Sequence, residues 1–187
     1  NPLLRERDLD LEREVVLEEI AEVDDTPDDL VHELFGLELW GTHPYGHHIL
    51  GTRETVGSMQ ADDLRRMHGE RYVGANLVVA AAGHVDHDEL VAQVERCLGD
   101  LEPGTPTPVV APPPATDRFD RQVERAAAQT HLVMGSRSVA HSDRLRLAVV
   151  LVSQAFGGGM SSRLFQRIRE EMGLVYSVYS FHSFYDA

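Results

Sequence analysis

A chain of 187 residues with a formal net charge of −14 is long enough for one ordinary domain or two small ones. The acidic charge argues against nucleic acid and anionic membranes as main partners, because both require basic surfaces. No run approaches the ~18 apolar residues of a membrane span. A single cysteine, Cys97, excludes an intrachain disulfide framework and cysteine-type zinc sites. Peptides, basic ones included, remain compatible partners.

The first hundred residues alternate between helical periodicity and turn signals. Thr26 and Pro27 predict the start of a helix, because threonine is a good N-cap and proline fits the first helical position. The expected elements, in chain order, are a charged helix over residues 3–23, a helix over 27–40, a loop over 41–46, a helix opened by Thr55 or Ser58 that carries Leu64, Met67 and Tyr72, a buried strand over 77–83, and a helix capped by Asp86 or His87 that ends near Leu98.

The composition then changes, because six prolines fall between Leu101 and Thr116 without apolar periodicity. Such a stretch predicts an extended linker with a domain boundary near residue 110. The expected elements after it are a strand over residues 119–125, a strand over 130–135, an apolar helix from Ser142 through Phe156, a break at glycines 157–159, a helix from Ser161 or Ser162 to Gly173, and a strand over 174–184.

This order of elements is not the steady βαβ alternation of a parallel sheet. It predicts an α+β fold with antiparallel sheets and helices in two halves. We expect residues 1–102 to be the C-terminal part of a first domain, residues 103–118 to be a proline-rich linker, and residues 119–187 to be the N-terminal part of a second domain.

Two glutamates of the opening helix stand apart from the others. At ~100° per residue, Glu12 and Glu19 fall on the face that carries the valines and Ile20, away from the solvated glutamates. A charge buried in an apolar stripe costs several kcal/mol unless it is paired or binds a metal. The two carboxylates are therefore expected to have a cation as partner. An ion pair to Arg5, Arg13 or Arg53 and a bound metal ion are the alternatives.

Four segments resemble, in the right order, the pitrilysin/insulinase-type (M16) family of zinc metallopeptidases, with the processing-peptidase-like branch as the nearest match. The resemblance covers nearly the whole chain. The matching segments are Glu12–Ile20, His43-Pro44-Tyr45-Gly46 with Ile49-Leu50-Gly51-Thr52, Asp63-Leu64 through Tyr72 and Asn76, and Gly159–Phe165 with Arg169–Tyr176.

The resemblance implies two homologous domains that form a clamshell around an unfolded peptide, both incomplete in this chain. It implies that Glu19 is the third ligand of a Zn²⁺ ion and that Glu12 supports the site. The family's His-x-x-Glu-His, which supplies two ligands and the general base, is absent from this sequence. The chain is therefore expected to be an interior fragment that is inactive alone. His84 and His87 are also three residues apart, but they lie at a predicted turn and not within a helix, so they do not replace this motif. For His43, a structural role is favoured, in which its imidazole caps a turn.

In the second half the resemblance implies that Arg169 and Tyr176 contact substrate. Arginine offers a planar fork of donors to a carbonyl or an oxyanion, and tyrosine offers a hydroxyl. A phosphate-binding role of the glycines at 157–159 is disfavoured, because no lysine accompanies them.

We therefore expect the full-length parent to be a zinc metalloendopeptidase that hydrolyses unfolded peptides. The alternative is a non-catalytic, processing-peptidase-like partner subunit that binds peptide or a catalytic chain. The expected partners are a peptide or unfolded protein and a second copy or homologous subunit, with neither nucleic acid nor membrane. The expected compartment is the bacterial cytoplasm, since no disulfide framework is possible.

Overall fold

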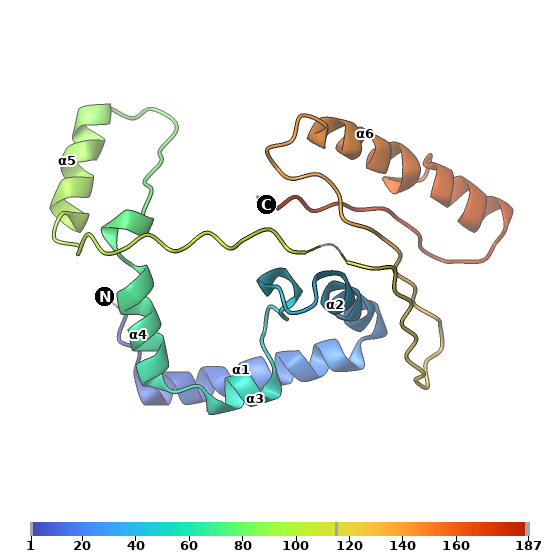
Figure 1. Cartoon of the computed structure of the whole chain (residues 1–187), viewed down its shortest axis with the longest axis horizontal. Helices are drawn as coiled ribbons and strands as arrows, with labels where there is room; N and C mark the ends of the chain where they lie inside the picture. Colours follow the sequence, from blue (N-terminus) through green and yellow to red (C-terminus); the bar gives the residue numbers. More distant parts are fainter. Residues whose placement is uncertain (1, 115, 186–187) are drawn as a thin grey trace. The chain divides into compact units, whose positions relative to one another are not determined.

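The structure is a computed structural model that describes residues 2–114 and 116–185 (Figure 1). Its regular elements are helices. In chain order they are α1 (Glu6–Asp25), α2 (Pro27–Trp40), the 3-10 turn η1 (Pro44–Gly46), α3 (Arg53–Ser58), α4 (Ala61–Arg71), the 3-10 turn η2 (Gly74–Asn76), α5 (His87–Leu98), α6 (Arg146–Gly157) and the π-helix η3 (Phe165–Glu171).

Helix boundaries follow the local capping chemistry, and most predicted helices are confirmed. The side chain of Asp86 caps α5 by accepting hydrogen bonds from the backbone N–H groups of Asp88 and Glu89. The single helix predicted after residue 55 is wrong, because two helices stand there. Thr52 and Gln60 each form a capping box, so the chain starts a helix twice and breaks between them.

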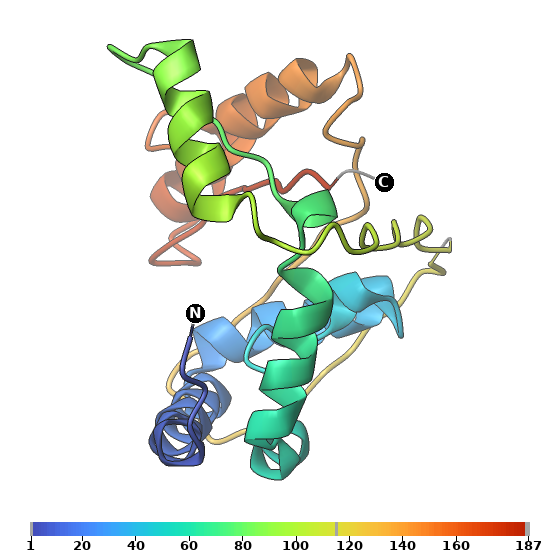
Figure 2. The ribbon, with the colours of Figure 1, turned by 90° about the vertical axis from the view of Figure 1, so that its left-hand side faces the viewer.

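The predicted α+β fold with antiparallel sheets is wrong for the described part of the chain, which contains no strand. The runs 77–83, 119–125, 130–135 and 174–184 are drawn without a strand arrow in both views (Figures 1 and 2). A strand needs a neighbour that exchanges ladder hydrogen bonds with it. The backbone hydrogen bonds among the described residues form no such ladder, so the β-favouring side chains of these runs leave them extended and unpaired.

The chain groups into two compact units that are not consecutive in sequence. Unit 1 comprises Asn1–Glu33 and His47–Val110, and unit 2 comprises Leu34–Gly46 and Ala111–Ala187. Helix α2 therefore gives its first half to unit 1 and its second half to unit 2. The division into an incomplete first domain, a linker and an incomplete second domain stays a prediction.

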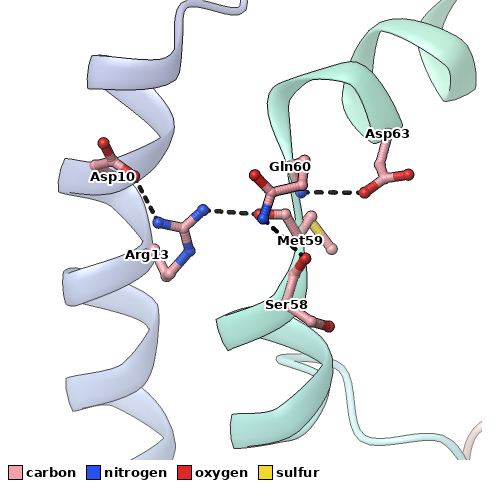
Figure 3. A network of polar contacts seen from close by, with 6 residues as sticks. All are labelled: Asp10, Arg13, Ser58, Met59, Gln60 and Asp63. Carbon is pink, nitrogen blue, oxygen red and sulfur yellow. Dashed lines mark hydrogen bonds and ion pairs between the residues drawn. The ribbon is translucent and has the colours of Figure 1, made fainter.

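In unit 1, α3 lies against α1 (Figure 1), and Arg13 of α1 makes a polar contact with the chain just after α3. The guanidinium of Arg13 donates to the Asp10 carboxylate at 2.6 Å and to the backbone oxygen of Met59 at 2.7 Å (Figure 3). Met59 lies in the break between α3 and α4, where the N–H of Gln60 donates to Asp63 at 3.0 Å. The Arg13 side chain is only 18% exposed. It fastens α1, which carries both candidate glutamates, to the rest of the unit.

In unit 2, the second half of α2 packs by aromatic contacts. The ring of Trp40 meets those of Tyr45 and Tyr185 edge to face, each at 5.6 Å between centroids, and the two tyrosines stack at 4.2 Å. One turn earlier, Phe35 contacts Phe119 at 5.7 Å. Such pairs add about 0.5–1.5 kcal/mol each beyond their buried area, and they integrate residues 34–46 into unit 2.

Replacing Arg13 by leucine is expected to lower the free energy of unfolding by about 1–3 kcal/mol, because the Met59 carbonyl loses a charged donor in a half-buried place. Urea denaturation followed by circular dichroism measures the loss. The matched control is Arg66→Leu. Arg66 pairs with Asp63 on the surface, with 68% of its side chain exposed, and exposed pairs contribute about 0–1 kcal/mol. Equal losses in the two variants would reject the anchoring role of Arg13.

Candidate functional site

The two candidate glutamates lie on α1, two turns apart on one face. Both are exposed, and α1 has no buried residue among those described. The apolar stripe expected around them is only partly shielded from solvent, since Val15 is 52% exposed while Val16, Ile20 and Val23 are half-buried. The expectation that Glu12 and Glu19 are buried charges is therefore wrong, and burial does not oblige them to have a cation.

The alternative that Glu12 and Glu19 form ion pairs with arginines is wrong, because each of the three arginines considered contacts an aspartate instead. Arg5 donates to Asp8 at 2.8 Å and Arg13 donates to Asp10, while Arg53 lies 3.8 Å from Asp24. Within residues 2–114 and 116–185, no hydrogen bond or ion pair involves Glu12 or Glu19. Both carboxylates are accordingly available to a ligand.

The described residues do not form a metal site. No group of three or more histidine, cysteine, aspartate and glutamate side chains could hold a metal ion in the part of the chain that the structure describes. A catalytic zinc ion takes three protein ligands and a water molecule. The residues that the structure describes therefore do not fit a complete zinc centre.

Arg169 and Tyr176 are brought together in unit 2. Arg169 lies near the end of η3, where its guanidinium sits 4.5 Å from the Phe165 ring centroid and 5.5 Å from that of Tyr176. The chain can double back between them because Gly173 adopts a φ of +62°, which glycine takes without strain. Glu170 adds a charge contact at 3.7 Å.

The two rings orient the guanidinium by cation–π attraction while leaving the pair open to solvent. Arg169 keeps about a third of its side-chain surface and Tyr176 is 83% exposed. A cationic fork beside a phenol hydroxyl can bind a peptide carbonyl or an anionic oxygen. The sequence analysis did not identify Phe165 as a member of this group. Its position four residues before Arg169 on a predicted helix could have indicated the contact, because such residues are neighbours on a helix surface.

Two of the family-like motifs have structural roles. In the turn at η1, the His43 ring accepts a hydrogen bond from the N–H of Tyr45 at 3.2 Å, which confirms the predicted capping imidazole. Gly51 takes a φ of +79° and leads into Thr52, the N-cap of α3. In this structure the first motif forms a capped turn and the second leads into a helix start.

Unit 1 contains a cavity of about 250 Å³, and one of the residues that line it is Ile20, which follows Glu19 in the sequence. On its rim, the pKa of the Glu54 carboxyl is lowered by its own backbone N–H and by the Thr52 side chain, which donate hydrogen bonds to it. The cavity can accept a small apolar group. Its lining includes the apolar side chains of Ile20, Val23, Leu30 and Leu50. It also includes two pairs of polar side chains in contact, His48 with Glu33 and Arg53 with Asp24.

None of the helices in the described residues is both long enough and apolar enough to cross a membrane.

Comparisons with solved structures show the fold. The chain superposes with a TM-score of 0.82 on the crystal structure of a peptidase M16 inactive domain from Pseudomonas fluorescens, at 23% identity, over 99% of this chain and 45% of that one. A protease from Helicobacter pylori gives a TM-score of 0.74 at 18% identity, over 97% of this chain and 46% of that one.

Comparisons of sequence show the family. An uncharacterised zinc protease of Streptomyces coelicolor is 42% identical over 97% of this chain and 41% of its own length, and one of Mycobacterium leprae is 45% identical over 92% and 40%. The zinc protease YmxG of Bacillus subtilis, also uncharacterised, is 37% identical over 97% and 44%. The chain thus spans about two fifths of the length of these curated relatives.

The model of the peptidase M16 inactive domain matches residues 58–187, which is well over half of the sequence. The chain therefore belongs to the peptidase M16 family.

Proposed function

We propose that this chain is part of a zinc-dependent metalloendopeptidase that hydrolyses peptide bonds in unfolded peptides. Membership of the M16 family and the printed names of the bacterial relatives, which are zinc proteases, support this. Because the chain spans less than half of those relatives, the activity is assigned to the full-length parent. The chain alone is expected to be inactive.

The observation that carries the proposal is the state of Glu19. Its carboxylate is exposed on α1 and has no partner among the described residues, although arginines nearby are paired with other acids. In the proposal Glu19 is the third zinc ligand and Glu12 supports the site from two turns away. The two histidine ligands and the general base belong to a His-x-x-Glu-His that this sequence does not contain.

The proposed contribution of unit 2 is substrate contact through Arg169 and Tyr176. The guanidinium is oriented by Phe165 and Tyr176, so its remaining donors face a ligand with little loss of rotamer freedom. The proposed ligand is an oxygen of the peptide main chain, to which the arginine donates its fork and the tyrosine its hydroxyl.

The remaining parts of the proposal concern partners and compartment. The substrate is a peptide or an unfolded protein, and a second copy or a homologous subunit is the expected partner. The bacterial cytoplasm is the proposed compartment. Bacterial relatives support it, and so does Cys97, a free and exposed cysteine in a chain with no second one.

A second candidate function is supported by the family match itself. The model that matches residues 58–187 is described as an inactive domain. It favours a non-catalytic partner subunit of the processing-peptidase kind, which binds peptide or a catalytic chain. The two candidates differ in the full-length parent, where a His-x-x-Glu-His upstream of Glu12 is expected for the enzyme and its absence for the partner subunit.

In the full-length parent, Glu19→Gln is expected to reduce bound zinc to well below one ion per chain and to lower peptide hydrolysis by at least about 100-fold, because an amide is a far weaker zinc ligand than a carboxylate. Metal analysis after dialysis and a fluorogenic peptide assay measure the two effects. Glu12→Gln is expected to cost about 10- to 100-fold in metal affinity or activity.

The matched control for both changes is Glu18→Gln, an exposed glutamate of the same helix, which should leave zinc and activity unchanged. Zinc content that is the same in Glu19→Gln and Glu18→Gln would reject the ligand role.

Arg169→Ala in the same parent is expected to lower peptide turnover by about 10²- to 10³-fold while zinc stays near one ion per chain, since the arginine contacts substrate and not metal. Tyr176→Phe keeps the ring beside the guanidinium and tests the hydroxyl alone. Arg167→Ala is the control, because Arg167 pairs with Glu171 on the surface. A parallel loss of zinc in Arg169→Ala would make the residue structural.

A further inference from the structure

We infer that the proline-rich segment, residues 102–114 and 116, is a strap that is fixed to unit 1 at one end and to unit 2 at the other. Among the residues that the structure describes, 108–110 lie free between the two attachments. Composition alone predicts an extended linker. The contacts that the strap makes within each unit point instead to a short pivot.

The first attachment is made by backbone hydrogen bonds within unit 1. The N–H of Gly74 donates to the oxygen of Glu102 and the N–H of Ala75 donates to the oxygen of Pro103, both at 2.8 Å. Two consecutive bonds of this kind fix the direction of the strap as it passes the turn η2.

Side chains complete this attachment. Gly104 has a φ of +63°, and a Cβ built on it would lie 2.3 Å from Cβ of Val73, so only glycine fits there. Three residues on, the N–H of Thr107 donates to the side-chain oxygen of Asn76 at 2.8 Å. Val73 is one of the few buried apolar residues among those described, at 5% exposure. The strap therefore covers part of the core of unit 1 and is held on both sides of it.

The second attachment lies in unit 2 and centres on Arg137. Its guanidinium donates to the oxygen of Pro113 at 3.0 Å, to the hydroxyl of Thr116 at 2.7 Å and to the oxygen of Leu39 at 3.3 Å. The Thr116 hydroxyl itself donates to Leu39 at 2.6 Å. The same guanidinium lies over the Trp40 ring, 4.8 Å from its centroid. A planar fork that also stacks is specific to arginine, and lysine cannot reproduce it.

His43 adds a third contact at the beginning of this attachment. Its Nδ1 accepts from the N–H of Tyr45, so in the neutral ring the proton is on Nε2, which donates to the oxygen of Ala111 at 2.9 Å. The strap is thus held to the C-terminal end of α2 at Thr116 and to the turn after α2 at Ala111.

Residues 108–110 have none of these contacts in the part of the chain that the structure describes. Val109 is 94% exposed and Val110 is 48% exposed, and Pro108 has no N–H to donate. Three residues are all that separate the last bond to unit 1 from the first bond to unit 2. The strap therefore limits local chain mobility to a pivot at 108–110.

Backbone ¹⁵N relaxation of the chain described here tests the strap, because the amides of Thr107, Val109, Val110, Ala111 and Thr116 report on both attachments and the pivot. We expect order parameters near about 0.85 at Thr107, Ala111 and Thr116 and below about 0.6 at Val109 and Val110. Uniformly low values across these five amides would overturn the inference.

Two variants are expected to loosen one attachment each. Arg137→Lys should bring Thr116 below about 0.6 and leave Thr107 rigid, whereas Gly104→Ala should bring Thr107 below about 0.6 and leave Thr116 rigid. Gly69→Ala is the control for the glycine change, because Gly69 lies in α4 of the same unit and a Cβ there would meet nothing within 4 Å.

Thr116→Val serves where Arg137→Lys fails to fold, since it removes one hydroxyl and keeps the shape of the side chain. Loss of rigidity on both sides of the pivot in any single variant would show that the attachments are not independent, and would overturn the strap with two anchors.

Discussion

The contact of Arg137 with the C-terminal end of α2 is the interaction on which the arrangement of unit 2 depends. The last carbonyl groups of a helix lack partners within the helix, and that end carries partial negative charge. Arg137 donates to one of those carbonyls, on Leu39, and brings a positive charge to it. The same side chain holds Thr116 and covers Trp40. Segments around residues 39, 116 and 137 are thereby joined through one guanidinium.

Hydrogen bonds from arginine side chains hold segments of each unit together, and they are prominent because few side chains are fully buried. Among the described residues, the buried apolar side chains are Ala61 and Val73. The contacts that place α1 are likewise polar, through Arg13 and the Met59 carbonyl. Hydrogen bonds to charged donors contribute about 1.5–3 kcal/mol when they are shielded from water, so these arginines do the positioning that a larger apolar core does elsewhere.

The helices could be predicted from the sequence because their signals are local. Pro27 and Asp86 mark helix starts, and Gly173 marks a reversal, through chemistry that each residue carries with it. The strands could not be predicted in the same way. Residues 77–83 and 174–184 have the side chains of strands, but a strand exists only through its neighbour, and a run of valines and tyrosines does not state whether one is present.

The residues of the candidate site could be predicted from the sequence, but their burial and the side chains that pack around them could not. The periodicity of α1 correctly placed Glu12 and Glu19 on one face but assigned that face to the interior. Whether a face is buried depends on what packs against it, which the sequence of the helix does not contain. Arg169 and Tyr176 were paired by resemblance to a family motif. Their geometry depends on Phe165 and on the turn at Gly173, and the motif alone specifies neither.

Because α2 is shared, no single peptide bond divides the chain into self-sufficient pieces. Severing it after Val110 would separate residues 111–187 from residues 34–46, which carry the aromatic partners of Phe119 and Tyr185 and the helix end that Arg137 contacts. Exchange of one unit between relatives by recombination would thus need several simultaneous crossovers. The two units are expected to be inherited together and to accumulate compensating substitutions along α2.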